Sequence, residues 1–395
     1  AQFRPRDRRP IYEWARDNIT LRAPYTITCT PGYDPFDVER SRHFIKVFDT
    51  LQDPYCREVN ILKPIRGGGT MIADIWSGWT RDCDPGPIMF VLQTGDIAIE
   101  HANRKLMPVW RSIPSVKTMI DGLPVKKVCG TNIGFADGNT FQVNGPSVTH
   151  LQTNAFRYVV LDECWLWDSG RMADAEGRIG DYQKMELSKI LRVSQGGPRQ
   201  FRQLHECDWN RAYHNACIWE WTVTCNQCGH RMQPLFSAQR DDGSYWGLNW
   251  DKHKLPNGDW DVARSAPTVR FNCQKCDWAH TNCRRTQADW NRTGDYALVT
   301  AFNRKKQSLR WPAQIDFPWD ELCELWLNAC NAFERGDPMP KLQFYQKRQA
   351  MMMDEELMLR HGVQLQRLVY DVKTDWPDEL YRFLTIDRQD EDKFW

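Results

Sequence analysis

The chain has 395 residues, and its 52 Lys and Arg against 51 Asp and Glu leave a formal net charge of +1. The length suits two or three domains, and the near-neutral charge excludes attraction to nucleic acid by the overall field, so a DNA contact needs a local patch such as Arg304, Lys305 and Lys306. No apolar run approaches the ~18 residues of a membrane span, and the 14 scattered cysteines favour bound metal and free thiols in a reducing cytosol over a disulfide framework.

The N-terminal part predicts an arm that is followed by a strand, a loop and a helix. Residues 1–40 are rich in Arg and Pro, and we expect them to lie over a domain whose core spans residues 41–218. The extended run REVNIL (57–62) leads straight into KPIRGGGT (63–70), and residues 70–79 have the apolar spacing of a helix. A strand, a glycine-rich turn and a helix in this order are typical of a phosphate-binding loop.

The glycine loop departs from the consensus G-x-x-x-x-G-K-[ST], because Gly69 stands where the lysine belongs, just before Thr70. Lys63, at the front of the loop, is the candidate replacement, and an ordinary glycine-rich turn is the alternative. Successive glycines can direct backbone N–H groups inward, and Thr70 can offer a hydroxyl to Mg²⁺. The predicted phosphate-binding residues are Lys63, Arg66, Gly67, Gly68, Gly69 and Thr70.

Further along the chain, apolar runs of strand length alternate with helical patterns. We predict buried strands at 87–94, 156–163, 188–197 and 296–303, and a helix over 96–113 that starts at an aspartate. Continuous apolar strands that alternate with helices favour an α/β fold with a parallel sheet and helices on both faces. Polar residues follow several of these strands, at the edge of the sheet where ligands bind in open α/β folds.

Two of the predicted strands end in residues suited to nucleotide chemistry. The first ends in Asp162 and Glu163: Asp162 can hold Mg²⁺ through water, and Glu163 can polarise an attacking water. The second ends in Ser194 and Gln195, which can sense a γ-phosphate. The alternatives are a surface acid pair and a plain strand end. The glycine loop, the acids and their order along the chain together favour a nucleotide site.

A change of pattern between residues 219 and 290 predicts an inserted zinc-ribbon-like module. Apolar periodicity fades there, and two C-x-x-C pairs stand 44 residues apart. Each pair can direct two thiolates at one tetrahedral Zn²⁺, and four thiolates leave no open position for catalysis. The predicted zinc ligands are Cys225, Cys228, Cys273 and Cys276.

The remainder of the chain predicts the end of the core and a helical linker over residues 291–375. Helices are expected at 319–337 and 341–358. Residues 376–395 begin a new strand and then stop.

The order of these features resembles the large terminase subunit of tailed phages, of the lambda-like (GpA) family. The resemblance rests on the displaced lysine at 63, the LDE of 161–163, the Ser-Gln strand and the paired C-x-x-C motifs. It implies a RecA-like P-loop ATPase that uses ATP and Mg²⁺ to drive duplex DNA into a capsid, followed by an RNase H-like nuclease. The implied partners are a small terminase subunit, the capsid portal protein and further copies in a ring, in the cytoplasm of the infected host.

The resemblance also implies roles for single residues. Lys63 matches the family's displaced lysine, Thr70 the Mg²⁺ hydroxyl, and Ser194–Gln195 the coupling motif. Tyr33 in the arm matches an adenine-stacking residue, and Asp387 the first metal-binding acid of the nuclease. Since the sequence stops eight residues later, we expect that nuclease site to be incomplete within these residues.

Two other functions remain as alternatives. The first is another P-loop DNA motor, such as a translocase or a helicase. The second is a zinc-bearing DNA-binding scaffold with a degenerate nucleotide site, which the missing lysine before Thr70 favours and the presence of both Lys63 and Glu163 opposes.

Overall fold

The computed structural model describes residues 7–21, 34–124, 128–129, 131–151, 154–199, 207–240, 242–354, 388–390 and 393–394. The chain divides into two compact units, Ala1–Glu355 and Glu356–Trp395. In the second unit, the described residues form one antiparallel pair, β20 (Arg388–Asp390) with β21 (Lys393–Phe394). No helix among the described residues is long and apolar enough to cross a membrane.

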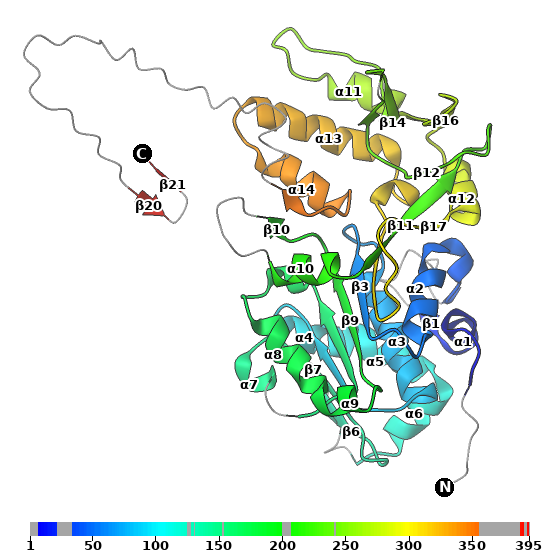
Figure 1. The fold of residues 1–395 in the computed structure, drawn as a ribbon, viewed down its shortest axis with the longest axis vertical. Helices are drawn as coiled ribbons and strands as arrows, with labels where there is room; N and C mark the ends of the chain where they lie inside the picture. The colour runs from blue at the N-terminus through cyan, green and yellow to red at the C-terminus, as the bar shows by residue number, and fades with distance from the viewer. Residues whose placement is uncertain are drawn as a thin grey trace, which may run out of the picture. The chain divides into compact units, whose positions relative to one another are not determined.

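An eleven-stranded mixed sheet organises the first unit (Figure 1). Its centre is parallel, in the order β11-β18-β3-β9-β8-β4-β7, and antiparallel strands are added at both edges. The expected α/β fold is therefore confirmed. The parallel strands are β3 (Glu58–Leu62), β4 (Ile88–Val91), β7 (Thr140–Asn144), β8 (Tyr158–Asp162), β9 (Lys189–Ser194), β11 (Cys217–Thr224) and β18 (Lys306–Arg310). The edge strands are β5 (Val128–Cys129), β6 (Asn132–Gly134), β12 (Arg231–Met232) and β17 (Asp295–Leu298).

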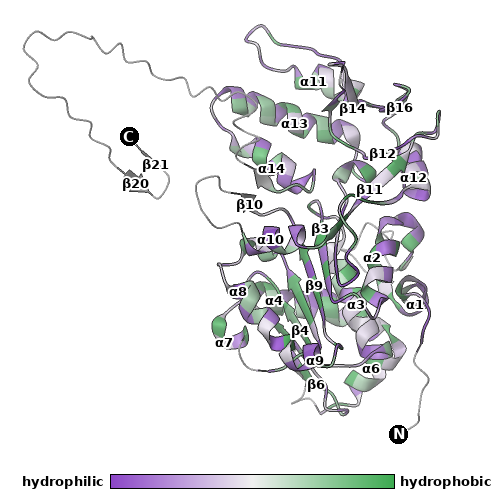
Figure 2. Ribbon diagram, in the orientation of Figure 1, coloured by the Kyte–Doolittle hydropathy of each residue, from purple (hydrophilic) through white to green (hydrophobic). Residues whose placement is uncertain are grey.

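Alternate residues of the central strands supply two separate hydrophobic cores, one on each face of the sheet. Val160 of β8 faces one core, whereas its neighbours Val159 and Leu161 face the other. Strands β4 (IMFV) and β8 (YVVLD) are apolar on both faces, and green stretches of ribbon are visible in the centre of the sheet in Figure 2. Helices of the first face are α1 (Ile11–Asn18), α2 (His43–Gln52), α3 (Gly69–Cys83), α4 (Gly95–His101), α5 (Met107–Ser112) and α6 (Pro114–Asp121). Helices of the second face are α7 (Val148–Leu151), α8 (Arg171–Glu176) and α10 (Asp208–His214).

Three predicted elements differ in detail from the structure. The helix expected over 96–113 is one helical run, with a π-helical turn at Ala102–Leu106 between α4 and α5. The prediction of a buried strand at 296–303 is wrong in the extent and the position of the strand. Strand β17 ends at Leu298, and it is an antiparallel edge strand that pairs with β11. The helix expected over 341–358 ends early, since α14 spans Met339–Lys347 and the short strand β19 occupies Met353–Asp354.

A smaller four-stranded antiparallel sheet carries much of the cysteine-rich region. Its order is β13-β14-β15-β16, and α13 packs beside it through contacts such as Phe236 with Trp326, whose ring centroids lie 5.3 Å apart. Buried Phe271, Trp290 and Trp319 join this region to the first core, so the two sheets share one apolar interior. The elements are β13 (Ala238–Gln239), β14 (Tyr245–Asn249), β15 (Arg270–Asn272), β16 (Ala279–Thr281), α11 (Val262–Ser265), α12 (Arg284–Thr293) and α13 (Trp319–Glu334).

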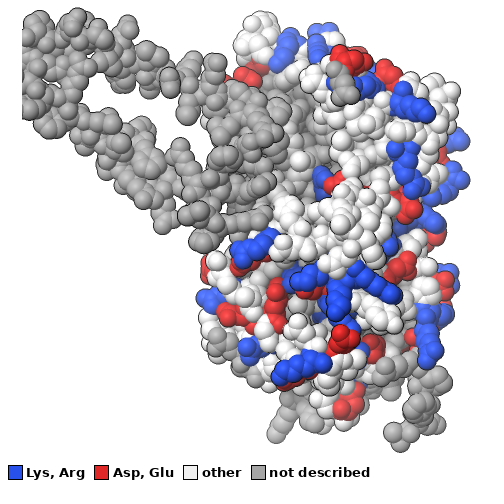
Figure 3. Space-filling model, in the orientation of Figure 1, with Lys and Arg blue, Asp and Glu red and all other residues white. Residues whose placement is uncertain are grey.

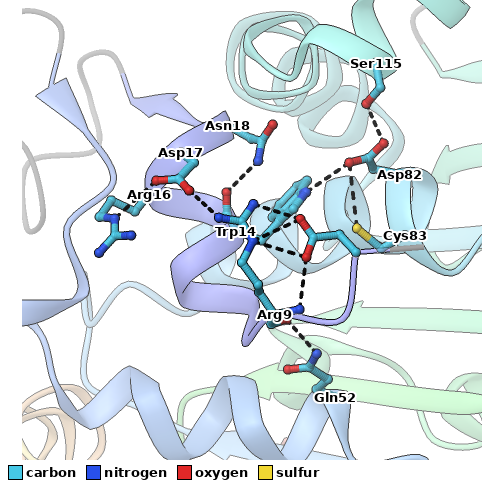
Figure 4. Close-up of polar contacts among 10 residues, drawn as sticks. Arg9, Trp14, Arg16, Asp17, Asn18, Gln52, Asp82, Cys83 and Ser115 are labelled. Carbon is cyan, nitrogen blue, oxygen red and sulfur yellow. Dashed lines mark hydrogen bonds and ion pairs between the residues drawn. The ribbon is translucent and has the colours of Figure 1, made fainter. Parts of the chain in front are cut away.

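The described part of the N-terminal arm is bonded to the end of α3 (Figure 4). Trp14 of α1 donates its indole N–H to Asp82 at 2.9 Å, and Asp82 also accepts from the hydroxyl of Ser115. Within the arm, Arg9 forms ion pairs with Asp7, which precedes α1, and with Asp17 in the last turn of α1. Trp14 is buried in the core, and its bond to Asp82 holds the described part of the arm against the body of the first unit.

Candidate functional site

The glycine loop joins β3 to α3 in a conformation that requires its glycines. Gly68 has a φ of 80°, and a Cβ atom there would lie 2.5 Å from Cζ of Phe44. A Cβ at Gly69 would lie 2.3 Å from Cγ1 of Val193 in β9. Both distances are shorter than real carbon contacts allow, so β9 and α2 leave room only for glycine at these two positions.

The side chain of Lys63 passes through the space that a side chain at position 69 would use. A Cβ at Gly69 would lie 3.0 Å from Cε and 3.3 Å from Cδ of Lys63. Lys63 is itself buried at the end of β3. The side chain of Lys63 therefore passes beside position 69, where the consensus loop has its lysine.

Glu163 lies opposite Lys63 and accepts from several donors. Its Oε1 forms a buried ion pair with Nζ of Lys63 and accepts from the side-chain amide of Gln195 at 3.3 Å. Its Oε2 accepts from the backbone N–H of Gln195 at 3.2 Å and from the indole N–H of Trp165 at 3.0 Å. Glu163 has a left-handed φ of 52°, which is uncommon for a residue with a side chain and turns this carboxylate toward the loop. Trp165 was not among the predicted site residues, because a tryptophan two positions after an acid pair carries no sequence signal of its own.

Asp162 faces the start of α3 and is only partly satisfied. Its Oδ2 accepts from the Thr70 hydroxyl at 2.9 Å, whereas its buried Oδ1 has no hydrogen-bond partner among the described residues. A buried carboxylate oxygen without a donor is costly unless a cation or a water completes it. Thr70 and Asp162 therefore offer two oxygens to a hard cation such as Mg²⁺.

The two acids differ in charge behaviour. Burial, followed by the nearby charge of Glu163, raises the pKa of Asp162 to about 6. Burial also acts to raise the pKa of Glu163, but the charge and hydrogen bond of Lys63 outweigh it, and the pKa lies below its ordinary value. The surroundings of Glu163 thus stabilise its negative charge, whereas those of Asp162 stabilise the negative charge of that carboxylate only weakly.

Strand β9 connects the loop to the acids, because it lies between β3 and β8. The carbonyl of Ser194 accepts a hydrogen bond from the backbone N–H of Lys63 at 3.1 Å. The Ser194 hydroxyl accepts one from the backbone N–H of Trp165 at 3.2 Å. Gln195 contacts Glu163 as described, and its own Oε1 is buried without a partner among the residues the structure describes. The predicted Ser-Gln pair therefore lies within the same cluster as Lys63, Thr70 and both acids.

A second cluster consists of four cysteine sulfurs that lie within 4.8 Å of one another: those of Cys225, Cys228, Cys273 and Cys276. The pairs Cys225–Cys276 and Cys228–Cys273 are each 3.8 Å apart, and all four are free thiols. A tetrahedral ion bonded to sulfur at ~2.3 Å holds its ligands roughly 3.8 Å apart, so the donor set fits Zn²⁺.

The two cysteine turns have matching backbones. Gly229 and Asp277 follow the second cysteine of each pair with φ of 68° and 58°. Each donates its N–H to the carbonyl of the first cysteine of its pair, at 3.0 and 3.2 Å. Two like turns thus present two thiols each to one point in space.

Two predicted site residues, Tyr33 and Asp387, lie outside the described residues.

Comparison with known proteins gives a family for these features. Residues 36–294, most of the chain, match the family model described as "Phage terminase large subunit gpA, ATPase domain". Among solved structures, the chain is similar to the large terminase ATPase domain of Thermus phage P74-26 and to a mutant of that domain, with TM-scores of 0.40 and 0.39. Each is 10% identical over 81% of this chain and 95% of the other. Scores this low add nothing to the family match, and no curated protein matches the chain.

Proposed function

The chain belongs to the family of the phage terminase large subunit gpA ATPase domain, and we propose that it hydrolyses Mg²⁺–ATP to move duplex DNA into a capsid. The observation that carries the proposal is the meeting of Lys63, Thr70, Asp162 and Glu163 at the carboxyl ends of β3 and β8. A cation, a hydroxyl and two acids at a helix N-terminus are the groups that phosphoryl transfer from a nucleotide requires.

In this proposal Lys63 is the phosphate lysine of a P-loop. Without nucleotide, Lys63 and Glu163 neutralise each other in a buried ion pair. Polyphosphate competes for the Lys63 ammonium, and Glu163 is then free to accept a hydrogen bond from the attacking water. The anionic state that Lys63 maintains in Glu163 is the state a general base needs.

The other loop residues complete the nucleotide site. Backbone N–H groups of Gly68 and Gly69 bind phosphate oxygens at the N-terminus of α3, while the N–H of Gly67 closes the turn by donating to the carbonyl of Pro64 at 3.0 Å, and Arg66 supplies a second positive charge. Thr70 and Asp162 would hold Mg²⁺, which neutralises phosphate charge when bound. Tyr33 stacks on the adenine.

Ser194 and Gln195 report the state of the γ-phosphate in this proposal. Gln195 bonds the same carboxylate that Lys63 does, so a change at Glu163 alters the contacts at the end of β9. From there the change can reach the chain that follows β9.

We further propose that the four cysteines bind one structural Zn²⁺ in an inserted module over 219–290, and that the P-loop core, its continuation and the helical linker occupy 41–218 and 291–375. Four thiolates fill a tetrahedral ion, so this zinc stabilises the fold. The assembly is a ring on the portal with a small terminase subunit, in the cytoplasm of the infected host.

Steady-state ATP hydrolysis by the purified chain, measured with and without linear duplex DNA, tests this function. The proposal expects Mg²⁺-dependent hydrolysis that duplex DNA stimulates. DNA binding without any hydrolysis would support the scaffold with a degenerate site, and strand separation on forked DNA would support a helicase.

A further inference from the structure

The C-terminal end of α14 and Arg348, which follows it, are bonded to two loops of the proposed nucleotide site and to the turn at Ala313. The carbonyl of Lys347 accepts from the N–H of Ile65 in the glycine loop at 2.7 Å. The side-chain amide of Gln346, which is buried, donates to the carbonyl of Gly196, just beyond the Ser-Gln pair, at 2.6 Å. The carbonyl of Arg348 accepts from the N–H of Ala313 at 2.8 Å. Residues 346–348 are therefore fixed against the proposed phosphate site, although Gln346 lies 283 positions after Lys63 in the sequence.

Arg348 directly follows Lys347, and Arg66 directly follows Ile65, so the bond between Lys347 and Ile65 brings the backbones of the two arginines close together. The Arg348 guanidinium lies over the ring of Phe317 at 4.4 Å, and no hydrogen bond or ion pair within the described chain uses it. Arg66, exposed in the glycine loop with a φ of 58°, likewise forms no ion pair with any residue that the structure describes. Neither guanidinium is therefore neutralised by an ion pair with an acid that the structure describes.

The electrostatics agree with this arrangement. Burial lowers the pKa of Arg348, and the positive charge of Arg66 acts in the same direction. Glu321 and Asp316 act in the opposite direction, yet neither pairs with Arg348. Bringing like charges together costs free energy, which a bound anion recovers.

We propose that Arg348, together with Arg66, binds the terminal phosphates of the nucleoside triphosphate. Planar guanidinium groups bind phosphate oxygens through paired hydrogen bonds, and the Phe317 ring orients one of them. The ligand is thus met from two sides, by the loop after β3 and by the segment after α14. This inference rests on the proposed nucleotide site and assigns it a residue that the glycine loop does not contain.

Binding of fluorescent ATP, ADP and AMP analogues to Arg348→Ala tests the proposal. Lys347→Ala is the matched control, because its ammonium bonds only to Gln343 on α14 among the described residues, whereas its backbone contact to Ile65 is kept. We expect Arg348→Ala to bind the ATP analogue at least tenfold more weakly, with AMP binding unchanged and Lys347→Ala equal to wild type. Equal ATP affinity in Arg348→Ala and wild type overturns the inference and leaves the proposed function standing. Wild-type protein that binds no ATP analogue overturns both.

Thermal unfolding separates a ligand contact from a packing role. If Arg348 serves the nucleotide, Arg348→Ala and the milder Arg348→Gln keep the melting temperature of the ligand-free protein and lose part of the increase that Mg²⁺–ATP produces. If both variants melt lower without ligand and show the full increase with ATP, the residue only packs on Phe317 and the proposal fails.

Discussion

At the scale of single residues, the proposed site is an ion pair that nucleotide binding has to rearrange. Lys63 and Glu163 are buried against each other, and Trp165 and Gln195 hold the same carboxylate. A base fixed by several donors keeps its orientation when the lysine moves away. Asp162 has a different role, since it bonds Thr70 and retains one unsatisfied oxygen.

The two acids should therefore fail in different ways when they are neutralised. We expect Glu163→Gln to bind Mg²⁺–ATP and stall before hydrolysis, because the metal ligands remain and the water loses its base. Asp162→Asn should weaken the binding that depends on Mg²⁺. Nucleotide titrations at several Mg²⁺ concentrations, with single-turnover hydrolysis, check this, and an equal loss of affinity in both variants would contradict the assignment.

His43 should make stability fall in mild acid. It is buried beside Phe44 and Trp311, neither ring nitrogen has a partner among the described residues, and burial lowers its pKa to about 3. In the unfolded chain the imidazole of His43 takes up a proton near pH ~6.5, whereas in the folded chain it stays neutral. The free energy of unfolding therefore has its full value above that pH. Below it, the free energy of unfolding falls by up to about 1.4 kcal/mol per pH unit until the pH reaches the pKa of the folded state. Urea unfolding between pH 4.5 and 7.5 should show a shallower pH dependence in His43→Leu than in wild type. Exposed His150→Ala is the control, and identical slopes in all three proteins would refute the claim.

At the scale of elements, the sequence predicted what depends on local pattern. Strands β3, β4, β8 and β9 and helix α3 were predicted because each is a continuous apolar run or a clear helical spacing. The order of the loop, the acids and the Ser-Gln pair along these strands led to the candidate site, whose residues the structure brings together.

Strand β18 could not be predicted, because its sequence KQSLR has no apolar pattern. It pairs with β3 and β11 in the centre of the sheet. Its buried Ser308 donates to the carbonyl of Tyr213 and accepts from the amide of Asn60, and Gln307 accepts from the indole of Trp219. Hydrogen bonds to residues far away in the sequence, and not apolar side chains alone, hold this strand in the sheet, and the local sequence does not indicate such bonds. The approach of Arg348 to the loop was missed for the same reason.

The two cysteine turns should need a bound metal ion to stay folded. Elemental analysis is expected to give one zinc per chain, and Cys225→Ser with Cys273→Ser should lose it and increase hydrogen exchange over residues 225–281, since metal binding contributes folding free energy there. Strands β3, β8 and β9 should keep their protection. Exposed Cys283→Ser is the control, because it lies outside the cluster. A metal-free protein with the same exchange in this region would rule out the structural zinc.

At the scale of the whole molecule, the formal net charge is only +1. The face in Figure 3 shows Lys and Arg interspersed with Asp and Glu. The basic run that the sequence offered as a possible DNA contact is largely neutralised: Arg304 pairs with Asp53 at 3.1 Å, Lys306 with Glu58 at 2.7 Å, and Lys305 lies 3.9 Å from Glu186. This run therefore adds little net charge to attract phosphates.

We accordingly expect the double variant Arg304→Ala, Lys305→Ala to keep its DNA-stimulated ATP hydrolysis within about twofold of wild type. Exposed ion pairs contribute little to stability, so the variant should also fold normally. The measurement is hydrolysis rate against duplex DNA concentration at two salt concentrations. A loss of stimulation of about tenfold, with unstimulated hydrolysis intact, would show that these residues do contact DNA.

The most direct test of the whole account is the rate of ATP hydrolysis by Lys63→Ala. The Lys63 side chain passes beside position 69, where the consensus loop has its lysine, and in the proposed site its cation stabilises the charge that develops on the phosphates. Lys46→Ala, which removes an ammonium that lies over Trp219 instead, is the matched control. The account predicts that Lys63→Ala loses hydrolysis by about tenfold or more, a barrier increase of at least ~1.4 kcal/mol, while Lys46→Ala keeps it. Unchanged turnover in Lys63→Ala would contradict the assignment of this loop as the site of ATP hydrolysis.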